Sequence, residues 1–371
     1  MANPLRTLQE YGQSAWLDFV SRDLLKSGEL GRLIADDGLA GMTTNPTIFE
    51  KAVSASDRYD ADIRLLADRG LDAARIFEAL AIRDVQEACD LFQPHYDSRG
   101  GRDGFVSLEV SPELARDAAG TLRAAQRLWA AVGRPNLMIK IPGTAEGLQA
   151  IEQCLALGIN VNVTLLFAVE RYLQIMAAHL AGLETRLAHG RPIDRVASVA
   201  SFFVSRVDSK IDPMLDALGG DARRQLRGTI AIANAQLAYA RFQETVRGPR
   251  WQALAARGAQ VQRPLWASTS TKDPAYPDVY YVEALVAPQT VDTLPPETLA
   301  AYRDHGDPQI RIGADASPAE QRLRALGGFG IDLAQVTRAL EVEGIAKFAA
   351  SYAACLDGVA QKAAALSVAR T

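Results

Sequence analysis

The sequence predicts a (β/α)8 TIM barrel, and three observations favour that fold class. Eight short, mostly apolar runs alternate with longer segments of helical periodicity. The runs are apolar at nearly every position, as parallel strands covered on both faces should be. Neither a GxGxxG pattern nor a P-loop follows the first run, which disfavours the runner-up, a doubly wound open sheet.

The eight expected strands are each bounded by Gly, Pro, Asn or Ser. We expect them at Ala15–Val20, Ala40–Thr44, Gly104–Val110, Asn136–Ile141, Ile159–Leu165, Ala197–Val204, Pro264–Thr269 and Thr290–Leu294. The gaps at Phe49–Arg102 and Asp208–Arg263 are long enough for more than one helix each. Ser111 is expected to cap a helix, and Gly248-Pro249 to end another.

Additional helices should follow the last strand, as a C-terminal extension. Ser317 begins a capping-box pattern, and an alanine-rich helix is expected from about Val342 to Leu366. We therefore expect one domain over residues 1–371, with barrel strands at about 15–294 and C-terminal helices at about 297–371.

The composition excludes several classes of function. With 40 basic and 44 acidic residues and a net charge of −4, the chain of 371 residues lacks the basic surface of a nucleic-acid-binding protein. No apolar run approaches membrane-spanning length, and the first residues do not resemble a signal peptide. The three cysteines are isolated, and the four histidines have no metal-ligand spacing. We expect a cytoplasmic protein with no metal, no cofactor and no membrane partner.

Polar side chains lie near the carboxyl ends of most of the expected strands, where apolar ones would be ordinary. Buried ionisable groups are costly unless they are paired or used. Because a TIM barrel has its active site at the carboxyl ends of its strands, these side chains should meet there. They are Asp18, Thr43, Thr44, Asn45, Ser107, Glu109, Lys140, Asn160, Asn162, Thr164, Ser201 and Ser268.

Each of these residues also has an ordinary structural explanation. Asp18 suits a helix cap, and Asn45-Pro46 suits a turn. Glu109 suits a simple ion pair with Lys140, whose stem could also carry the ammonium out to solvent. The coincidence of so many polar residues at matching strand positions favours a functional site.

A lysine is the strongest nucleophile in this set. Apolar neighbours, for which Met138, Ile139 and Ile141 are the candidates, would favour the neutral amine, which forms Schiff bases with carbonyls. The iminium accepts electrons when a carbon–carbon bond breaks, provided that a carboxylate takes a hydroxyl proton. Asp18 and Glu109 are both candidates for that base, and Glu109 with Thr164 could hold a water.

Four segments resemble the transaldolase family. They are Gly41–Phe49 (GMTTNPTIF), Leu137–Pro142 (LMIKIP) with Gly147 after it, Asn160–Phe167 (NVNVTLLF) and Ser201–Arg206 (SFFVSR). The resemblance extends from Asp18 to the Leu294-Pro295-Pro296 region, with several motifs in order. It implies a long bacterial form of a class I Schiff-base enzyme of the pentose phosphate pathway. Such an enzyme moves dihydroxyacetone from sedoheptulose 7-phosphate to glyceraldehyde 3-phosphate, giving erythrose 4-phosphate and fructose 6-phosphate.

The resemblance also implies roles for single residues. Lys140 would form the Schiff base, Asp18 would be the acid and base for bond cleavage, and Glu109 with Thr164 would hold the catalytic water. The remaining positions would form the substrate site. The dihydroxyacetone hydroxyls would be bound by Asn45, Asn162 and Ser201. Arg206 would bind the phosphate, and Phe203 would line the pocket. The family also implies sugar-phosphate substrates and either a monomer or a homodimer.

One segment departs from the family pattern. Many members have an arginine two residues after the serine that Ser268 matches, whereas this chain has Ser270 there, followed by Lys272. We expect Lys272, or Arg206 with serine hydroxyls, to contact the phosphate. Fructose 6-phosphate aldolases, the close alternative, have Gln where Glu109 stands and Tyr where Phe203 stands, so both positions favour the transaldolase. A non-catalytic sugar-phosphate-binding barrel would not be expected to keep Lys140 and Asp18.

Overall fold

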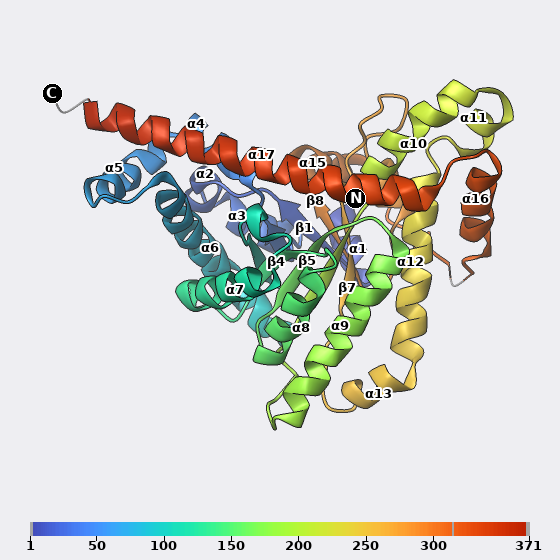
Figure 1. Cartoon of the computed structure of the whole chain (residues 1–371), viewed down its shortest axis with the longest axis horizontal. Helices are drawn as coiled ribbons and strands as arrows, with labels where there is room; N and C mark the ends of the chain where they lie inside the picture. The colour runs from blue at the N-terminus through green and yellow to red at the C-terminus, as the bar shows by residue number, and fades with distance from the viewer. Residues whose placement is uncertain (1–2, 314, 369–371) are drawn as a thin grey trace.

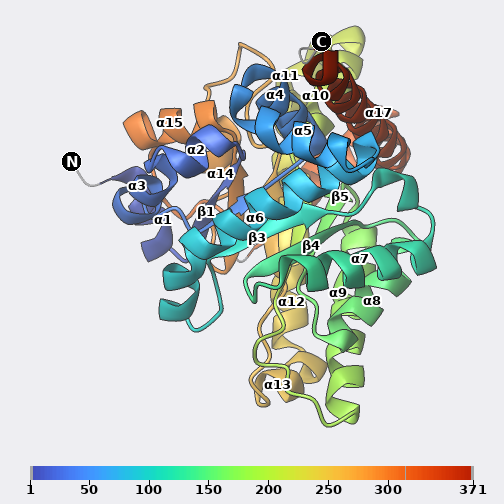
Figure 2. The same ribbon diagram turned by 90° about the vertical axis from the view of Figure 1, so that its left-hand side faces the viewer.

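A computed structural model of the chain describes residues 3–313 and 315–368. Eight parallel strands close into a barrel in the order β1 to β8, with helices around the outside (Figures 1 and 2). The (β/α)8 barrel that the sequence predicts is therefore confirmed. The strands are β1 Gln13–Asp18, β2 Gly41–Thr43, β3 Phe105–Glu109, β4 Leu137–Pro142, β5 Val161–Leu166, β6 Ser198–Phe203, β7 Arg263–Ala267 and β8 Thr290–Leu294.

The helices of the first half of the chain include the expected cluster between β2 and β3. That gap contains α4, a short 3-10 helix, α5 and the long α6. The helices are α1 Pro4–Glu10, α2 Arg22–Lys26, α3 Glu29–Asp36, α4 Pro46–Ala55, η1 Asp57–Tyr59, α5 Asp60–Asp68, α6 Ala73–Ser98, η2 Pro112–Leu114, α7 Ala118–Val132 and α8 Gly147–Leu157.

The second half of the chain has four helices between β6 and β7. This confirms the expectation that the other long gap contains more than one helix. Gly248 and Pro249 separate α12 from α13, as expected. The helices are α9 Val169–Ala188, α10 Ser205–Leu218, α11 Gly220–Leu226, α12 Ile230–Arg247, α13 Pro249–Ala255, α14 Tyr280–Ala284, α15 Pro296–His305, α16 Ser317–Gly328 and α17 Leu333–Val368.

The helix ends confirm one expectation and correct two. Ser111 caps a helix as expected, the short 3-10 helix η2, and the longer α7 begins separately at Asp117, which accepts the Gly120 N–H at 2.8 Å. Ser317 is the first residue of α16 rather than its cap, since its own N–H is taken by Asp315. The last helix begins at Leu333 rather than near Val342 and has 36 residues.

Helix α17 crosses the end of the barrel instead of packing along its side. In Figure 1 it runs as the long red helix from the α10 and α16 side to the α4 and α5 side. It contacts α4, α5, α6 and α10 as well as β5. No helix in the described part of the chain is both long and apolar enough to cross a membrane.

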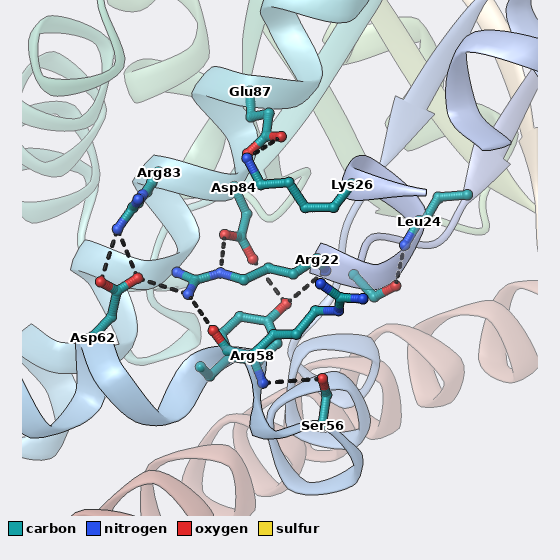
Figure 3. Close-up of polar contacts among 11 residues, drawn as sticks. Arg22, Leu24, Lys26, Ser56, Arg58, Asp62, Arg83, Asp84 and Glu87 are labelled. Carbon is teal, nitrogen blue, oxygen red and sulfur yellow. Dashed lines mark hydrogen bonds and ion pairs between the residues drawn. The ribbon is translucent and has the colours of Figure 1, made fainter. Parts of the chain in front are cut away.

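A buried ion network fixes the segment after β1 to the helices between β2 and β3 (Figure 3). Arg22 on α2 binds Asp84 on α6 at 2.9 Å and Asp62 on α5 at 2.6 Å. Tyr59 donates its hydroxyl to Asp84, at 2.9 Å, and lies under the Arg22 guanidinium. Each of these side chains has at least one partner in the network, which offsets much of the cost of burying Arg22 and Asp84, although Arg22 Nη2 has no hydrogen-bond partner among the described residues.

Candidate active site

The side chains that point into the barrel change from apolar to polar along the strands. A cluster separate from the main core takes residues from nearly every strand and so fills the barrel interior. Two residues further along a strand, the same face carries Asp18 after Trp16, Lys140 after Met138 and Ser201 after Val199. The apolar part of the cluster includes Trp16, Phe105, Met138, Val199, Leu265 and Val291.

Two small details of the backbone shape this interior. Gly41 faces the Trp16 indole so closely that a Cβ would lie 2.5 Å from it, so only glycine fits there. A register shift between Val163 and Leu166 in β5 accompanies a left-handed conformation at Leu165, whose φ is 61°. Thr164 and Leu165 both line the cavity as a result, although they are adjacent in a strand.

Lys140 lies at the centre of the polar end of the barrel. Its Nζ donates to Glu109 Oε1 at 2.9 Å and to the Thr44 carbonyl at 2.8 Å. The Thr44 hydroxyl also donates to Glu109 Oε2, at 2.6 Å. Only 11% of the Lys140 side chain and 9% of the Glu109 side chain are exposed, so the ion pair is largely shielded from water.

Burial raises the pKa of Glu109 above its ordinary value, although Lys140 and Thr44 both oppose that shift. The carboxylate therefore takes up a proton more readily than a carboxylate in water. A carboxyl of this kind, beside an amine, is suited to proton exchange with a bound carbonyl compound.

Asp18 projects into the same cavity from β1. Thr43 Oγ1 lies 2.8 Å from Asp18 Oδ1 and 2.7 Å from Thr293 Oγ1. Because Thr43 has one hydroxyl proton, which it donates to Asp18, Thr293 must donate to Thr43. Asn45 caps α4 with its side-chain oxygen and turns its amide nitrogen to within 3.5 Å of Asp18.

Asn162 connects three strands beneath the cavity. It donates to Ser107 Oγ at 3.0 Å and accepts from Ser201 Oγ at 2.7 Å. The side chain has no exposed surface, so its polar atoms are satisfied inside the protein. Of these three hydrogen-bonded side chains, Ser201 is the one that lines the cavity.

A cavity of about 500 Å³ opens at this end of the barrel. It is lined by nine of the eleven site residues that the sequence predicts; Glu109 and Asn162 lie behind its wall. The nine are Asp18, Asn45, Lys140, Thr164, Ser201, Phe203, Arg206, Ser268 and Lys272.

The Arg206 side of the cavity is cationic. Arg206 follows β6 at the start of α10 and lies over the Phe203 ring, 5.1 Å from its centroid. Burial lowers the pKa of Arg206, and Asp18 opposes that shift. Ser268 is in a left-handed conformation, with φ 57°, and its hydroxyl lies 3.0 Å from that of Ser205. Lys272 donates to Ser270 Oγ at 2.5 Å.

The sequence did not predict the roof of the cavity. The roof is formed by two helices. Helix α4 contributes Thr47, Ile48 and Lys51, and α17 contributes four more lining residues. The Thr47 and Ser351 hydroxyls join the two helices at 2.8 Å. No local sequence pattern could show that the last helix of the chain would reach a cavity formed by the barrel strands. The α17 residues are Gly344, Lys347, Phe348 and Ser351.

One expectation about the surroundings of Lys140 is wrong. Ile139 and Ile141 belong to the core between the strands and the outer helices, so they do not face the cavity. Met138 shares the inner face with Lys140 and lies below it in the barrel. The strand alternates, and only every second neighbour can affect the amine from the same side.

Comparisons with known proteins agree with the geometry. The family model described as "Transaldolase/Fructose-6-phosphate aldolase" matches residues 15–359. A protein of Acidothermus cellulolyticus named "Transaldolase" is 52% identical over 95% of both chains. One of Frankia alni with the same name is 48% identical over 98% of both chains. A "Transaldolase 2" of Nostoc sp. is 45% identical, over 98% of this chain and 99% of its own length.

Proposed function

This chain belongs to the transaldolase/fructose-6-phosphate aldolase family, and from that premise we propose that it is a transaldolase in which Lys140 carries the transferred unit as a Schiff base. The relatives named transaldolase match over nearly the whole chain, which supports this activity rather than a shared fold alone. The observation that carries the residue assignment is the position of Lys140. It lines the cavity while its Nζ contacts a carboxylate that is almost fully shielded.

Imine formation would begin with Lys140 and the ketone carbon of the donor sugar phosphate. The amine attacks the carbonyl, and the resulting carbinolamine must lose a water molecule that contains the former carbonyl oxygen. Glu109 supplies the proton exchange for that step, together with a water that the Thr164 hydroxyl helps to hold. The raised pKa of Glu109 supports this role, because such a carboxyl can both hold and release a proton.

Asp18 would perform the carbon–carbon cleavage. It takes the proton from the hydroxyl on the carbon next to the breaking bond, and the bond electrons flow into the iminium. Erythrose 4-phosphate leaves, and the dihydroxyacetone enamine remains on Lys140. The enamine carbon then attacks the aldehyde of glyceraldehyde 3-phosphate while Asp18 returns the proton, which gives the iminium of fructose 6-phosphate. Water hydrolyses this iminium, and fructose 6-phosphate departs, which leaves Lys140 as the free amine. The bond from Thr43 keeps the Asp18 carboxylate oriented in the cavity.

The hydroxyls of the dihydroxyacetone unit would bind to Asn45 and Ser201, which line the cavity. The sequence suggested direct contact from Asn162 as well, but its buried position would limit it to orienting Ser201 from behind the wall. Phe203 forms an apolar wall there, and Arg206 lies across its ring. Arg206 with Lys272 and Ser268 would bind the phosphate, since guanidinium and ammonium groups both suit phosphate oxygens.

Borohydride trapping tests this proposal directly. The enzyme is incubated with fructose 6-phosphate, reduced with borohydride and digested, and the modified peptide is identified by mass spectrometry. We expect the adduct on Lys140, and none in Lys140→Met, whose side chain is of similar length but has no amine. An adduct on another lysine would overturn the assignment.

Product analysis separates the two activities that the family name combines. Fructose 6-phosphate alone should yield little free dihydroxyacetone, whereas added erythrose 4-phosphate should allow rapid transfer to give sedoheptulose 7-phosphate. Rapid release of dihydroxyacetone without an acceptor would favour the aldolase.

We also infer a cytoplasmic enzyme that is a monomer or a homodimer, as in the family; sedimentation would distinguish the two states.

A further inference from the structure

Three cationic side chains from distant parts of the sequence meet at one side of the cavity. Arg206 comes from α10, Lys272 from the segment between β7 and α14, and Lys347 from α17. Burial lowers the pKa of Lys272, and the nearby charges of Arg206 and Lys347 lower it further, although Glu297 opposes them. Lys272 therefore lies within electrostatic reach of both Arg206 and Lys347, and all three side chains line the cavity.

Glu297 also lines the cavity and partly offsets the charge of Lys272, but in the described part of the chain it forms no salt bridge with this group. Within residues 3–313 and 315–368, no carboxylate forms a salt bridge with Arg206, Lys272 or Lys347. The acids on the same part of α17 have other partners: Glu341 pairs with Arg171, and Glu343 with Lys210. Like charges held together at a cavity wall are unfavourable until an anion binds between them.

Helix α17 is held over the cavity by contacts that do not involve Lys347. Gly344 lies so close to the barrel that a Cβ there would be 3.2 Å from Leu165 and 3.8 Å from the Arg206 guanidinium. Further along the helix, Lys362 pairs with Asp60 at 2.8 Å and donates to the Val53 carbonyl, also at 2.8 Å. Val53 and Asp60 belong to α4 and α5, and Figure 1 shows the helix continuing past the barrel to these two helices. The packing of the helix thus places Lys347 at the cavity.

We propose that Lys347 binds the substrate phosphate together with Arg206 and Lys272, so that the C-terminal helix is part of the substrate site. This inference rests on the proposed function, because it takes a phosphorylated sugar to be the occupant of the cavity. A phosphate monoester has a charge of about −1.5 to −2 at neutral pH, which one or two cations at a partly open site balance incompletely. Lys347 is exposed at the rim, where its long stem can follow the phosphate as substrates enter and leave.

The test compares acceptors with and without a phosphate. At saturating sedoheptulose 7-phosphate, kcat/KM is measured for glyceraldehyde 3-phosphate and for glyceraldehyde, and the inhibition constant is measured for inorganic phosphate. Lys347→Gln should lower kcat/KM for the phosphorylated acceptor about tenfold and weaken inhibition by phosphate similarly, because hydrogen bonds to charged groups contribute at this level. The rate with glyceraldehyde should stay within about twofold of that of the unmodified enzyme, since the lost contact is to phosphate alone.

Two further variants separate phosphate binding from a structural role. Lys347→Arg keeps the charge and should retain most of the preference for the phosphorylated acceptor. Arg338→Gln removes a cation from an exposed position of the same helix that does not line the cavity, and it should change neither constant. Equal losses with both acceptors, or a loss in Lys347→Arg as large as in Lys347→Gln, would overturn the inference.

The two proposals fail in different ways. If Lys347→Gln keeps the phosphate preference while borohydride still labels Lys140, the inference about α17 is wrong and the proposed function stands. If the unmodified enzyme gives no adduct on Lys140, the proposed mechanism is wrong. Inhibition by inorganic phosphate, measured with and without Lys347, then still decides whether the helix contributes to an anion site.

Discussion

Lys140 Nζ and Glu109 Oε1 lie 2.9 Å apart, and the two residues are register partners on the adjacent strands β4 and β3. The register fixes both side chains on the inner face of the barrel at the same height. An ion pair this well shielded is costly unless each partner is satisfied, and Thr44 completes the bonding of both residues. The same arrangement places a proton acceptor next to the proposed nucleophile.

Glu109→Gln should slow formation and hydrolysis of the imine without abolishing substrate binding. The amide can still accept from Lys140, but it cannot exchange a proton, so we expect kcat to fall about 100-fold or more. KM for fructose 6-phosphate should change by less than about threefold, because no binding contact is removed. Steady-state kinetics with rapid-quench borohydride trapping would measure both effects. An unchanged kcat would contradict the role proposed for Glu109.

Asp18→Asn should separate imine formation from bond cleavage. The amide fills the same space beside Thr43 but cannot take the hydroxyl proton, so transfer should slow by about 100-fold or more. Fructose 6-phosphate should still be trapped on Lys140 by borohydride at nearly full yield. If trapping disappears together with transfer, Asp18 is required before the bond breaks and its assigned step is wrong.

Arg22→Met should destabilise the protein by leaving Asp84 buried without its ion partner. Removing one member of a buried pair costs about 3–5 kcal/mol of unfolding free energy. The double variant Arg22→Met/Asp84→Leu should recover much of that loss, because both charges are gone and the apolar side chains can pack. Urea unfolding of the two variants and the unmodified protein tests this. A double variant no more stable than Arg22→Met would show that the contacts to Asp62 and Tyr59 matter more.

Asp292 should make the protein less stable as the pH rises toward 8. Burial raises the pKa of this carboxyl to about 8, with the hydroxyl of Thr269 as its hydrogen-bond partner at 2.8 Å. Between the ordinary carboxyl pKa of about 4 and this value, the folded state holds a proton that the unfolded chain has lost. Folding stability therefore decreases with rising pH across that window and levels off above it.

Asp292→Asn should remove that dependence, because the amide keeps the bond to Thr269 and does not titrate. Urea unfolding at several values between pH 5 and 8 should show a smaller loss of stability with pH, by at most about 1.4 kcal/mol per pH unit. Parallel curves for the variant and the unmodified protein would mean that Asp292 is ionised in the fold.

The strands were predictable because each one is a local apolar run with clear boundaries. Their alternation also placed Asp18, Glu109 and Lys140 correctly on one face, since parallel strands in a barrel bring their carboxyl ends together. The helix ends were harder. Ser111 and Asp117 are both good caps, and only the packing of the chain decides that Asp117 begins the α-helix.

The site was predictable where the strands carry it and unpredictable where helices cover it. Thr43 lies on β2 and Thr293 on β8, the two strands that pair with β1. Their hydroxyls meet because the barrel closes through the pairing of β1 with β8, which only the three-dimensional register reveals. Lys347 and Phe348 reach the cavity because α17 turns across the barrel end. The apolar residues of α17 have almost no helical periodicity, so the sequence does not show which face of this helix covers the barrel.

The path of α17 has a consequence for the order in which the protein is made. A ribosome produces the chain from its N-terminus, and all eight strands, with Lys140, Asp18 and Glu109, precede the last helix. Lys347, Gly344 and the anchor at Lys362 emerge only at the end of translation. The α17 side of the roof is therefore the last part of the cavity lining to be synthesised, after every strand that carries the polar side chains.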